Sequence, residues 1–299
     1  MLAPPLCDII EIMKIDGKKI SIVISKLLKK EVKKFKKRKL KLVTFLIGDA
    51  PDQESFVKIK AKTAKRIGLG FELIQYKTVP SFQVLAQRIK SENETKEVTG
   101  IIIQQPLPAQ LSTDTVYDYV DLPKEIEGHK NKSTFLPPLG LAVLTILKYI
   151  FTGLKMNSDL LVDINKDRQF FKKALKNKKV VVIGRGVTGG KPIGKTLNEV
   201  KINYIAINSK TPAPQSFLKE ADIIITAVGK YVITPDCVKP GAIIINAGVR
   251  KENNILKGDF EENEIKNIAG FYTPTPGGIG PIDVIYLYKN LIDAAKLQK

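Results

Sequence analysis

The sequence predicts an α/β fold with two domains, each built on a mostly parallel sheet flanked by helices. Short apolar runs alternate with longer amphipathic runs in both halves of the chain, and this alternation is typical of parallel sheets covered by helices. The 299 residues suffice for two hydrophobic cores, and 43% of them are hydrophobic, as is ordinary for a globular protein. We place a first domain at residues 1–150, joined by a C-terminal helix at 283–299, and a second domain at 151–282.

The first half contains a β-α-β-α-β pattern. Its elements are strand 41–48, helix 54–67, strand 71–79, helix 82–91 and strand 100–105. The last strand stops at Pro106, which has no N–H to donate to a sheet. A long apolar helix follows at 139–150, and the lysine-rich run from Lys29 to Lys41 fits the solvated face of an earlier helix.

The second half repeats the alternation. It follows a connecting segment at 151–177, part of which we expect to be helical. The expected elements are strand 179–183, helix 191–200, strand 203–207, strand 221–227, strand 241–246 and an amphipathic tail helix at 283–298.

Composition narrows the classes of function. The net charge is +19, but the excess is lysine spread along the chain rather than arginine clustered with aromatics, so we expect no nucleic-acid partner. Such a surface would instead steer a polyanionic small substrate. No apolar run reaches the roughly 20 residues that span a bilayer, and a secretory signal pattern is not seen, so we expect no membrane contact. Cys7 and Cys237 are expected to be free thiols in a reducing cytoplasm, with no metal site.

The segment at 272–281 combines stiffness with conformational freedom. Its sequence, Tyr-Thr-Pro-Thr-Pro-Gly-Gly-Ile-Gly-Pro, holds three prolines and three glycines. Proline fixes φ and removes a donor, while glycine reaches conformations that other residues avoid, so we expect neither a helix nor a central strand. We interpret the segment as a loop whose backbone passes close to a ligand; an ordinary connection is the alternative.

A second glycine-rich segment follows the strand at 179–183. Gly184, Gly186 and Gly189 match the spacing G-x-G-x-x-G, and a helix follows. A strand, a glycine turn and a helix N-terminus together present free N–H groups to a phosphate, which predicts a Rossmann-like dinucleotide site. The alternative is a tight βα turn without a ligand.

The next strand indicates the cofactor. An NAD site places an acid at the end of this strand, but the sequence here is Asn208-Ser209-Lys210-Thr211. Ser209 and Lys210, helped by Arg185, fit a 2′-phosphate, which favours NADP over NAD.

Several motifs together resemble the methylenetetrahydrofolate dehydrogenase/cyclohydrolase family over nearly the whole chain. They are Ile15-Asp16-Gly17-Lys18, the helix segment 55–62, Ile-Gln-Gln-Pro-Leu-Pro at 103–108, Gly184-Arg185-Gly186, Gly258-Asp259 and, most specifically, 273–281. The resemblance implies oxidation of 5,10-methylenetetrahydrofolate with a nicotinamide cofactor, hydrolysis of the methenyl cation to 10-formyltetrahydrofolate, and a homodimer.

The resemblance places the catalytic lysine at Lys60 and its glutamine partner at Gln104. Lysine in water is a poor base at neutral pH, but a nearby cation such as the methenyl product favours the neutral amine that hydrolysis needs. Gln104 ends a strand at the edge where parallel sheets bind ligands, and it can orient the amine without adding charge.

The chain departs from the family at several positions. Phe56 replaces a tyrosine one helical turn before Lys60, which removes a hydroxyl and puts hydrolysis in question. Glu127 replaces an aspartate expected to accept from pterin N–H groups, and the single histidine, His129, follows it. Asp283 replaces a threonine near the nicotinamide or folate.

The resemblance also implies which residues contact the substrate and the cofactor. Substrate contacts are expected at Phe56, Glu127, Pro276, Gly277 and Gly278, and cofactor contacts at Gly184, Arg185, Gly186, Gly189, Ser209, Val249 and Asp283. The scattered lysines suit a polyglutamylated folate. The alternatives are a dehydrogenase-only or degenerate paralogue and, in another class, a non-catalytic nucleotide- or nucleic-acid-binding protein.

Overall fold

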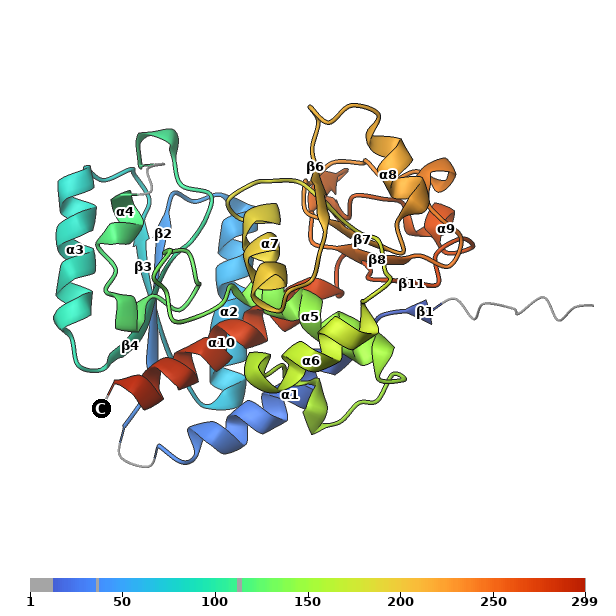
Figure 1. Ribbon diagram of the computed structural model, residues 1–299. Coiled ribbons are helices and arrows are strands. Elements are labelled where there is room, and N and C mark those ends of the chain that lie inside the picture. The colour runs from blue at the N-terminus through green and yellow to red at the C-terminus, as the bar shows by residue number, and fades with distance from the viewer. Residues whose placement is uncertain (1–12, 36–37, 112–114, 299) are drawn as a thin grey trace, which may run out of the picture.

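The computed structural model describes residues 13–35, 38–111 and 115–298, and it has two lobes side by side (Figure 1). The first lobe holds a parallel three-stranded sheet in the order β3-β2-β4. The second holds a parallel six-stranded sheet in the order β1-β11-β8-β7-β5-β6. The predicted α/β class with two mostly parallel sheets is confirmed.

The strands are short and mostly buried. In the first sheet they are β2 (Lys41–Ile47), β3 (Gly70–Tyr76) and β4 (Val98–Ile103). In the second they are β1 (Met13–Lys14), β5 (Val180–Ile183), β6 (Ile205–Ile207), β7 (Ile223–Thr226), β8 (Ile243–Asn246) and β11 (Phe271–Tyr272). An antiparallel hairpin, β9 (Arg250–Glu252) with β10 (Ile255–Lys257), stands apart from both sheets.

The helices of the first lobe have clear start and stop signals. They are α1 (Gly17–Val32), α2 (Pro51–Ile67), α3 (Phe82–Glu94) and α4 (Thr115–Asp118). Asp16 caps α1 by accepting from the Lys19 N–H, and Ser81 caps α3 in the same way. Pro51 sits in the first turn of α2, and Gly68, in the left-handed region at φ +87°, caps its C-terminal end.

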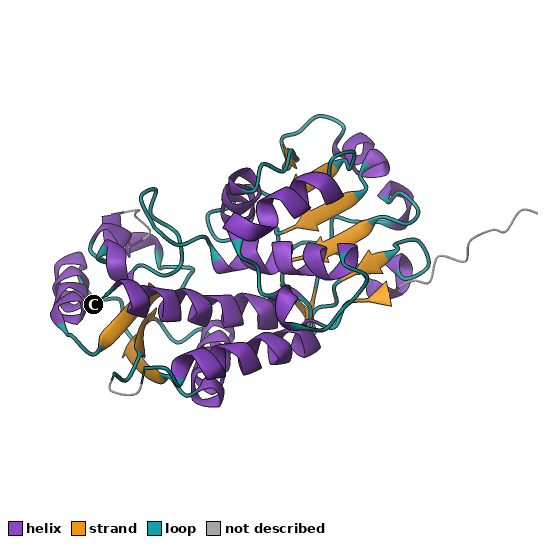
Figure 2. Ribbon diagram, turned by 60° about the horizontal axis from the view of Figure 1, so that its bottom comes forward, coloured by secondary structure: helices purple, strands orange, loops and turns teal. Residues whose placement is uncertain are grey.

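The second lobe and the join between the lobes contain the other helices. They are α5 (Pro138–Phe151), α6 (Ile164–Ala174), α7 (Gly190–Glu199), α8 (Pro214–Glu220), α9 (Glu262–Ile265) and α10 (Ile279–Leu297). α10 packs against α5, α1, α2 and β4, and α5 also packs against α7. α5 and α10 lie between the two sheets (Figure 1), and Figure 2 shows helices in purple filling the space between the two orange sheets, so these helices set the spacing of the lobes.

The hydrophobic core is continuous between the lobes. One cluster contains Leu42 and Ile102 from the first sheet, Ile225 and Ile245 from the second, and the buried faces of α1, α5 and α10. The opposite faces of the two sheets have separate clusters of their own. α5 is apolar over most of its circumference because it is enclosed by neighbours on all sides.

Several sequence-based boundaries differ from the structure. α2 begins at Pro51 rather than 54, since proline is tolerated in a first turn. The lysine run 29–41 is only partly helical: α1 ends at Val32, β2 begins at Lys41, and residues 36–37 lie outside the described residues. Residues 279–281, expected in a loop, form the first turn of α10, where Pro281 needs no intrahelical N–H partner.

The second sheet also recruits the start of the chain. β1 pairs in parallel with β11, so residues 13–14 leave the first lobe and form the edge of the six-stranded sheet. α8, α9 and the β9–β10 hairpin were not expected. Of the two cysteines, Cys237 is a buried free thiol and Cys7 lies outside the described residues. Within the described ranges, none of the helices is long and apolar enough to cross a membrane.

Candidate active site

Lys60 and Gln104 meet although 44 positions separate them in the sequence. The Nζ atom of Lys60, on α2, lies 2.9 Å from Oε1 of Gln104, which comes directly after β4. Gln104 is buried and uses its amide N–H to donate to the carbonyl of Gln105 at 2.8 Å, so its oxygen is turned to the lysine. The Tyr288 hydroxyl of α10 donates to the Lys60 carbonyl at 2.7 Å, which ties α2 to α10 at this point.

Glu127 is held beside the same strand end. Residue 125 forms a parallel bridge with Ile101 of β4, so the segment 125–127 runs alongside that strand. The buried Glu125 carboxylate accepts from the backbone N–H groups of Glu127 and His129, at 3.0 and 3.2 Å. Gly128 has φ +72°, and an added Cβ would lie 2.7 Å from the Phe135 carbonyl oxygen, so this turn requires glycine.

Burial and neighbouring charged groups shift the pKa values of two carboxyl groups in the site, those of Glu127 and Asp283. Burial raises the pKa of Glu127, while nearby His129 and Lys60 lower it. Burial also raises the pKa of Asp283 to about 6, while Lys60 lowers it and Glu127 raises it. The Lys60 side chain therefore lies close to two carboxyl groups whose pKa values are raised, an arrangement found more often at functional sites than elsewhere.

His129 borders Glu127 on the side of the interlobe cavity. Its Nε2 lies 3.6 Å from Oε2 of Glu127, and its ring lies 4.6 Å from the ring of Tyr117, centroid to centroid. Phe56, one turn before Lys60 on α2, leaves 40% of its surface exposed and so offers a free aromatic face.

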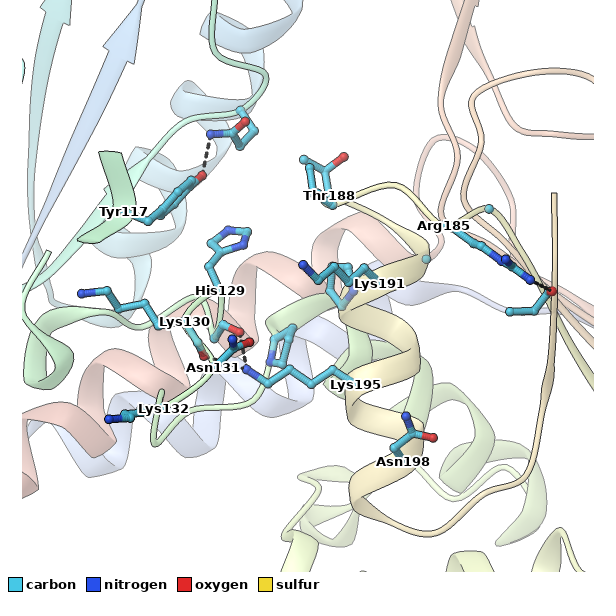
Figure 3. A pocket seen from close by; sticks show the side chains of 18 of the residues that line it. Tyr117, His129, Lys130, Asn131, Lys132, Arg185, Thr188, Lys191, Lys195 and Asn198 are labelled. Atoms are coloured by element: carbon cyan, nitrogen blue, oxygen red, sulfur yellow. Dashed lines mark hydrogen bonds between the residues drawn. The ribbon is translucent and has the colours of Figure 1, made fainter. Parts of the chain in front are cut away.

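A cavity of about 1050 Å³ opens between the lobes (Figure 3). The first lobe contributes Gln105, Tyr117, Gly128 and the basic stretch 129–132, and the second contributes the glycine turn and α7. Lys191 points across the cavity toward His129. Lys60, Gln104 and Glu127 are not in its lining; they lie beside it at the end of β4.

The glycine turn is tightly packed at three positions and open at one. Gly184 has φ +105°, and Cβ atoms added at Gly189 and Gly190 would lie 2.8 Å from Ala227 Cβ and 1.9 Å from the Gly184 carbonyl oxygen. An added Cβ at Gly186 would meet nothing within 4 Å. This open space at a helix N-terminus is the cradle that a dinucleotide phosphate needs, so these residues fit the cofactor.

The other expected cofactor residues are more scattered. Arg185 lines the cavity on the side of β6, where it donates to the Ala206 carbonyl at 2.7 Å (Figure 3). Ser209 is exposed in the turn after β6, and Val249 is 42% exposed in the loop after β8. Asp283 was expected to contact the cofactor. The charges that act on its carboxyl group are instead those of Lys60 and Glu127.

The segment 273–281 docks on the start of α1. An added Cβ at Gly17 would lie 1.7 Å from the Gly278 carbonyl oxygen, and one at Gly278 would lie 2.5 Å from that of Pro274. Gly277 has φ +103° and lies under the aliphatic chain of Lys18. This close packing requires a glycine at position 278 even without a ligand. Pro276 and Gly277 lie in the segment that leads into α10, and their contact with the substrate stays a prediction.

Sequence reasoning missed several supporting residues. Glu125, Asn290 and Lys195 hold the loop that carries Glu127, through bonds to its backbone. No local pattern marks them, because each acts on carbonyls or amides that only the fold brings near. Asp259 stands in the Gly258-Asp259 motif, but the sequence did not show what it does. It is fully buried and accepts from the Val228 and Lys230 N–H groups, both at 3.0 Å, and from the Thr226 hydroxyl at 2.6 Å, which shapes the loop after β7.

Comparison with known proteins identifies the family of this chain. Residues 15–127 match the tetrahydrofolate dehydrogenase/cyclohydrolase catalytic domain, and residues 168–299 match the NAD(P)-binding domain of the same family. The bifunctional protein FolD of Staphylococcus epidermidis is 33% identical over 298 residues, covering 95% of this chain and 97% of that protein. The FolD crystal structure from Campylobacter jejuni superposes with a TM-score of 0.84 at 25% identity, over 96% of this chain and 100% of the other. A 5,10-methylenetetrahydrofolate dehydrogenase from the silkworm, Bombyx mori, gives 0.80 at 27% identity, over 96% and 99%. With both halves matched in order, this chain belongs to the tetrahydrofolate dehydrogenase/cyclohydrolase family.

Proposed function

We propose that this chain oxidises 5,10-methylenetetrahydrofolate to 5,10-methenyltetrahydrofolate with NADP and then hydrolyses the product to 10-formyltetrahydrofolate. The observation that carries the proposal is the contact of 2.9 Å between Lys60 and Gln104, with Glu127 and Asp283 as neighbouring charges. Family membership supplies the substrate class, and these groups supply the chemistry.

For the oxidation, the chain's task is alignment. NADP supplies a hydride acceptor when it is bound, held by the backbone of the turn 184–190. Glu127 accepts from the pterin N–H groups, and the exposed ring of Phe56 packs against the folate. No side chain has to move a proton at the reacting carbon, so this step depends on the relative position of the two binding sites.

For the hydrolysis, Lys60 acts as the proton carrier. A water oxygen bonds to the bridging methenyl carbon, and the water proton passes to the neutral amine of Lys60. In the resulting adduct the hydroxyl oxygen releases its proton to water and forms the C=O bond, while the bond from that carbon to the pterin-ring nitrogen breaks. That nitrogen takes the proton held by Lys60, and the formyl group stays on the other nitrogen. Gln104 Oε1 fixes the amine by accepting one of its hydrogens.

The preference for NADP over NAD rests on the end of β6. Ser209 and Lys210 follow this strand where an NAD site carries an acid, and Lys210 is exposed. Arg185 reaches this region from the glycine turn through its bond to Ala206.

Lys60→Met separates the two reactions. We expect hydrolysis of methenyltetrahydrofolate, followed by its absorbance decay, to fall by at least about a hundredfold, as loss of a positioned acid–base group does. NADP reduction should fall less, because oxidation needs no proton transfer. The matched control is Lys62→Met, an exposed lysine two residues along α2.

Three outcomes would contradict the proposal or favour an alternative to it. Unchanged hydrolysis in Lys60→Met removes this lysine from the mechanism. Parent protein that reduces NADP but does not hydrolyse the methenyl compound is the dehydrogenase-only paralogue, for which the missing hydroxyl at Phe56 is the structural reason. Salt-dependent binding to DNA with no folate turnover favours the non-catalytic alternative.

Three further assignments belong to the same proposal. Residues 1–150 with the C-terminal helix hold the folate, and 151–282 hold the cofactor. The lysines at 130, 132 and 191, which line the interlobe cavity, suit a polyglutamylated folate, whose additional carboxylates would lower KM at low salt. A cytoplasmic homodimer follows from the family resemblance, and size measurement in solution tests the dimer.

A further inference from the structure

The loop that carries Glu127 is held by one of its own side chains and by side chains from α10 and α7. Glu125 accepts from the N–H groups of Glu127 and His129. Asn290 of α10 donates to the carbonyls of Ile126 and Leu136, at 2.8 and 2.9 Å. These bonds, with the bridge to Ile101, fix Glu127 relative to β4 and therefore relative to Gln104 and Lys60.

Lys195 reaches the same loop from the other lobe. It lies on α7, and its Nζ donates to the carbonyls of Gly128 at 2.7 Å and Lys130 at 3.0 Å (Figure 3). Both acceptors lie beyond Glu127, on the part of the loop that faces the cavity. Bonds from an ammonium to two backbone carbonyls are charge-assisted, so they hold the geometry more firmly than neutral bonds do.

The helix that carries Lys195 also begins at the dinucleotide turn. α7 starts at Gly190, whose backbone packs directly on Gly184, so the helix and the turn are one rigid unit. A link from α7 to residues 128–130 therefore relates the cofactor turn to the carboxylate loop. Burial lowers the pKa of Lys195 and the charge of Glu125 raises it, which is the environment of a lysine enclosed at an interface.

We propose that Lys195 is a positioning residue that sets the distance between the folate and the nicotinamide by clamping the Gly128 and Lys130 carbonyls to α7. The inference rests on the proposed function and adds a residue to it. Oxidation needs the two ligands aligned across the lobes, whereas hydrolysis uses groups of the first lobe and α10 alone. Losing the clamp therefore affects the two activities of one protein differently.

The test is the ratio of the two kcat values in Lys195→Met. We expect the ratio of dehydrogenase to cyclohydrolase kcat to fall by about tenfold or more, since small misplacements of reacting groups are costly. Lys195→Arg, which keeps donors at the same place, should restore much of the ratio. Should Lys195→Met fail to fold, Lys195→Gln, whose amide is too short to reach both carbonyls, takes its place.

Lys219→Met removes an exposed charge from α8 in the same lobe and should leave the ratio unchanged. A ratio that stays constant in Lys195→Met, whether both activities fall together or neither does, overturns the inference. Parent protein lacking both activities refutes the proposed function itself, so the two failures are distinguishable.

Discussion

At Asp283 the fold holds a carboxyl group against its own ionisation. Its pKa is raised from 3.8 to about 6, mainly by burial. Between these two values the folded protein binds a proton that the unfolded chain releases, so stability falls as pH rises from about 4 to 6. Above pH 6 the full penalty, at most about 3 kcal/mol, is present.

Asp283→Asn should remove that penalty. We expect the variant to unfold at higher urea concentration than the parent at pH 7.5, and the difference to shrink as the pH falls and to vanish only near pH 3, below both pKa values, where the aspartate is largely protonated in both states. Glu94→Gln, an exposed carboxylate at the end of α3, is the control. A stability difference that does not change with pH would show that the effect is packing rather than charge.

Glu127 is expected to act on binding. Replacing it with Gln keeps the shape and removes an acceptor charge, so the KM for methenyltetrahydrofolate should rise by about tenfold or more while kcat changes less. Steady-state hydrolysis rates measure both. Glu97→Gln, exposed before β4, serves as the control. A fall in kcat at constant KM would instead give Glu127 a role in the transition state.

The sequence predicted the pairing of Lys60 with Gln104 because each stands in a motif with a defined place on a helix or at a strand end. It could not predict that Lys195 and Asn290 reach the Glu127 loop, since both act on backbone carbonyls, which carry no sequence signal. Glycine content alone also could not separate Gly278, needed for packing, from Gly186, where space is open.

At the scale of elements, the turn before α7 offers a comparison of two glycines four residues apart. Gly190→Ala places a Cβ 1.9 Å from a backbone oxygen, so it should destabilise the fold by about 1–3 kcal/mol or more. Gly186→Ala meets nothing within 4 Å, so its stability should stay within about 0.5 kcal/mol of the parent.

Gly186→Ala should affect cofactor binding rather than stability. Gly186→Ala should fold normally and bind NADP more weakly, because its methyl group occupies the space for the phosphate. Thermal melts with and without NADP measure both effects. Unchanged NADP affinity in Gly186→Ala would mean that the dinucleotide does not approach this turn.

Long periodic elements were predictable and short ones were not. The buried strands β2, β4, β5, β7 and β8 and the helices α2, α3 and α7 follow from apolar runs and periodicity. β1 has only two residues, too few for any period, and its pairing with β11 depends on tertiary contact. The first turn of α10 was misassigned because its glycine and proline content resembles a loop, although the end of a helix tolerates both.

At the scale of the whole molecule, the two lobes share one core. Ile102 of β4 and Ile245 of β8 lie in different sheets, yet both belong to the hydrophobic cluster that α5 and α10 complete. α10 starts beside the dinucleotide lobe and ends against the first sheet, where Gln298 donates to the Thr99 carbonyl at 2.8 Å. Neither lobe can lose its structure without exposing the apolar surface of these helices.

The chain should therefore unfold in a single cooperative transition. We expect the calorimetric and van't Hoff enthalpies to agree. Ile102→Ala and Ile245→Ala, each expected to cost about 2–5 kcal/mol, should both shift the one transition. Val84→Ala, at a position 50% exposed on α3, should leave it in place. Two separate transitions, with each core substitution moving only the one of its own lobe, would show that the lobes are energetically independent and that α5 and α10 merely connect them.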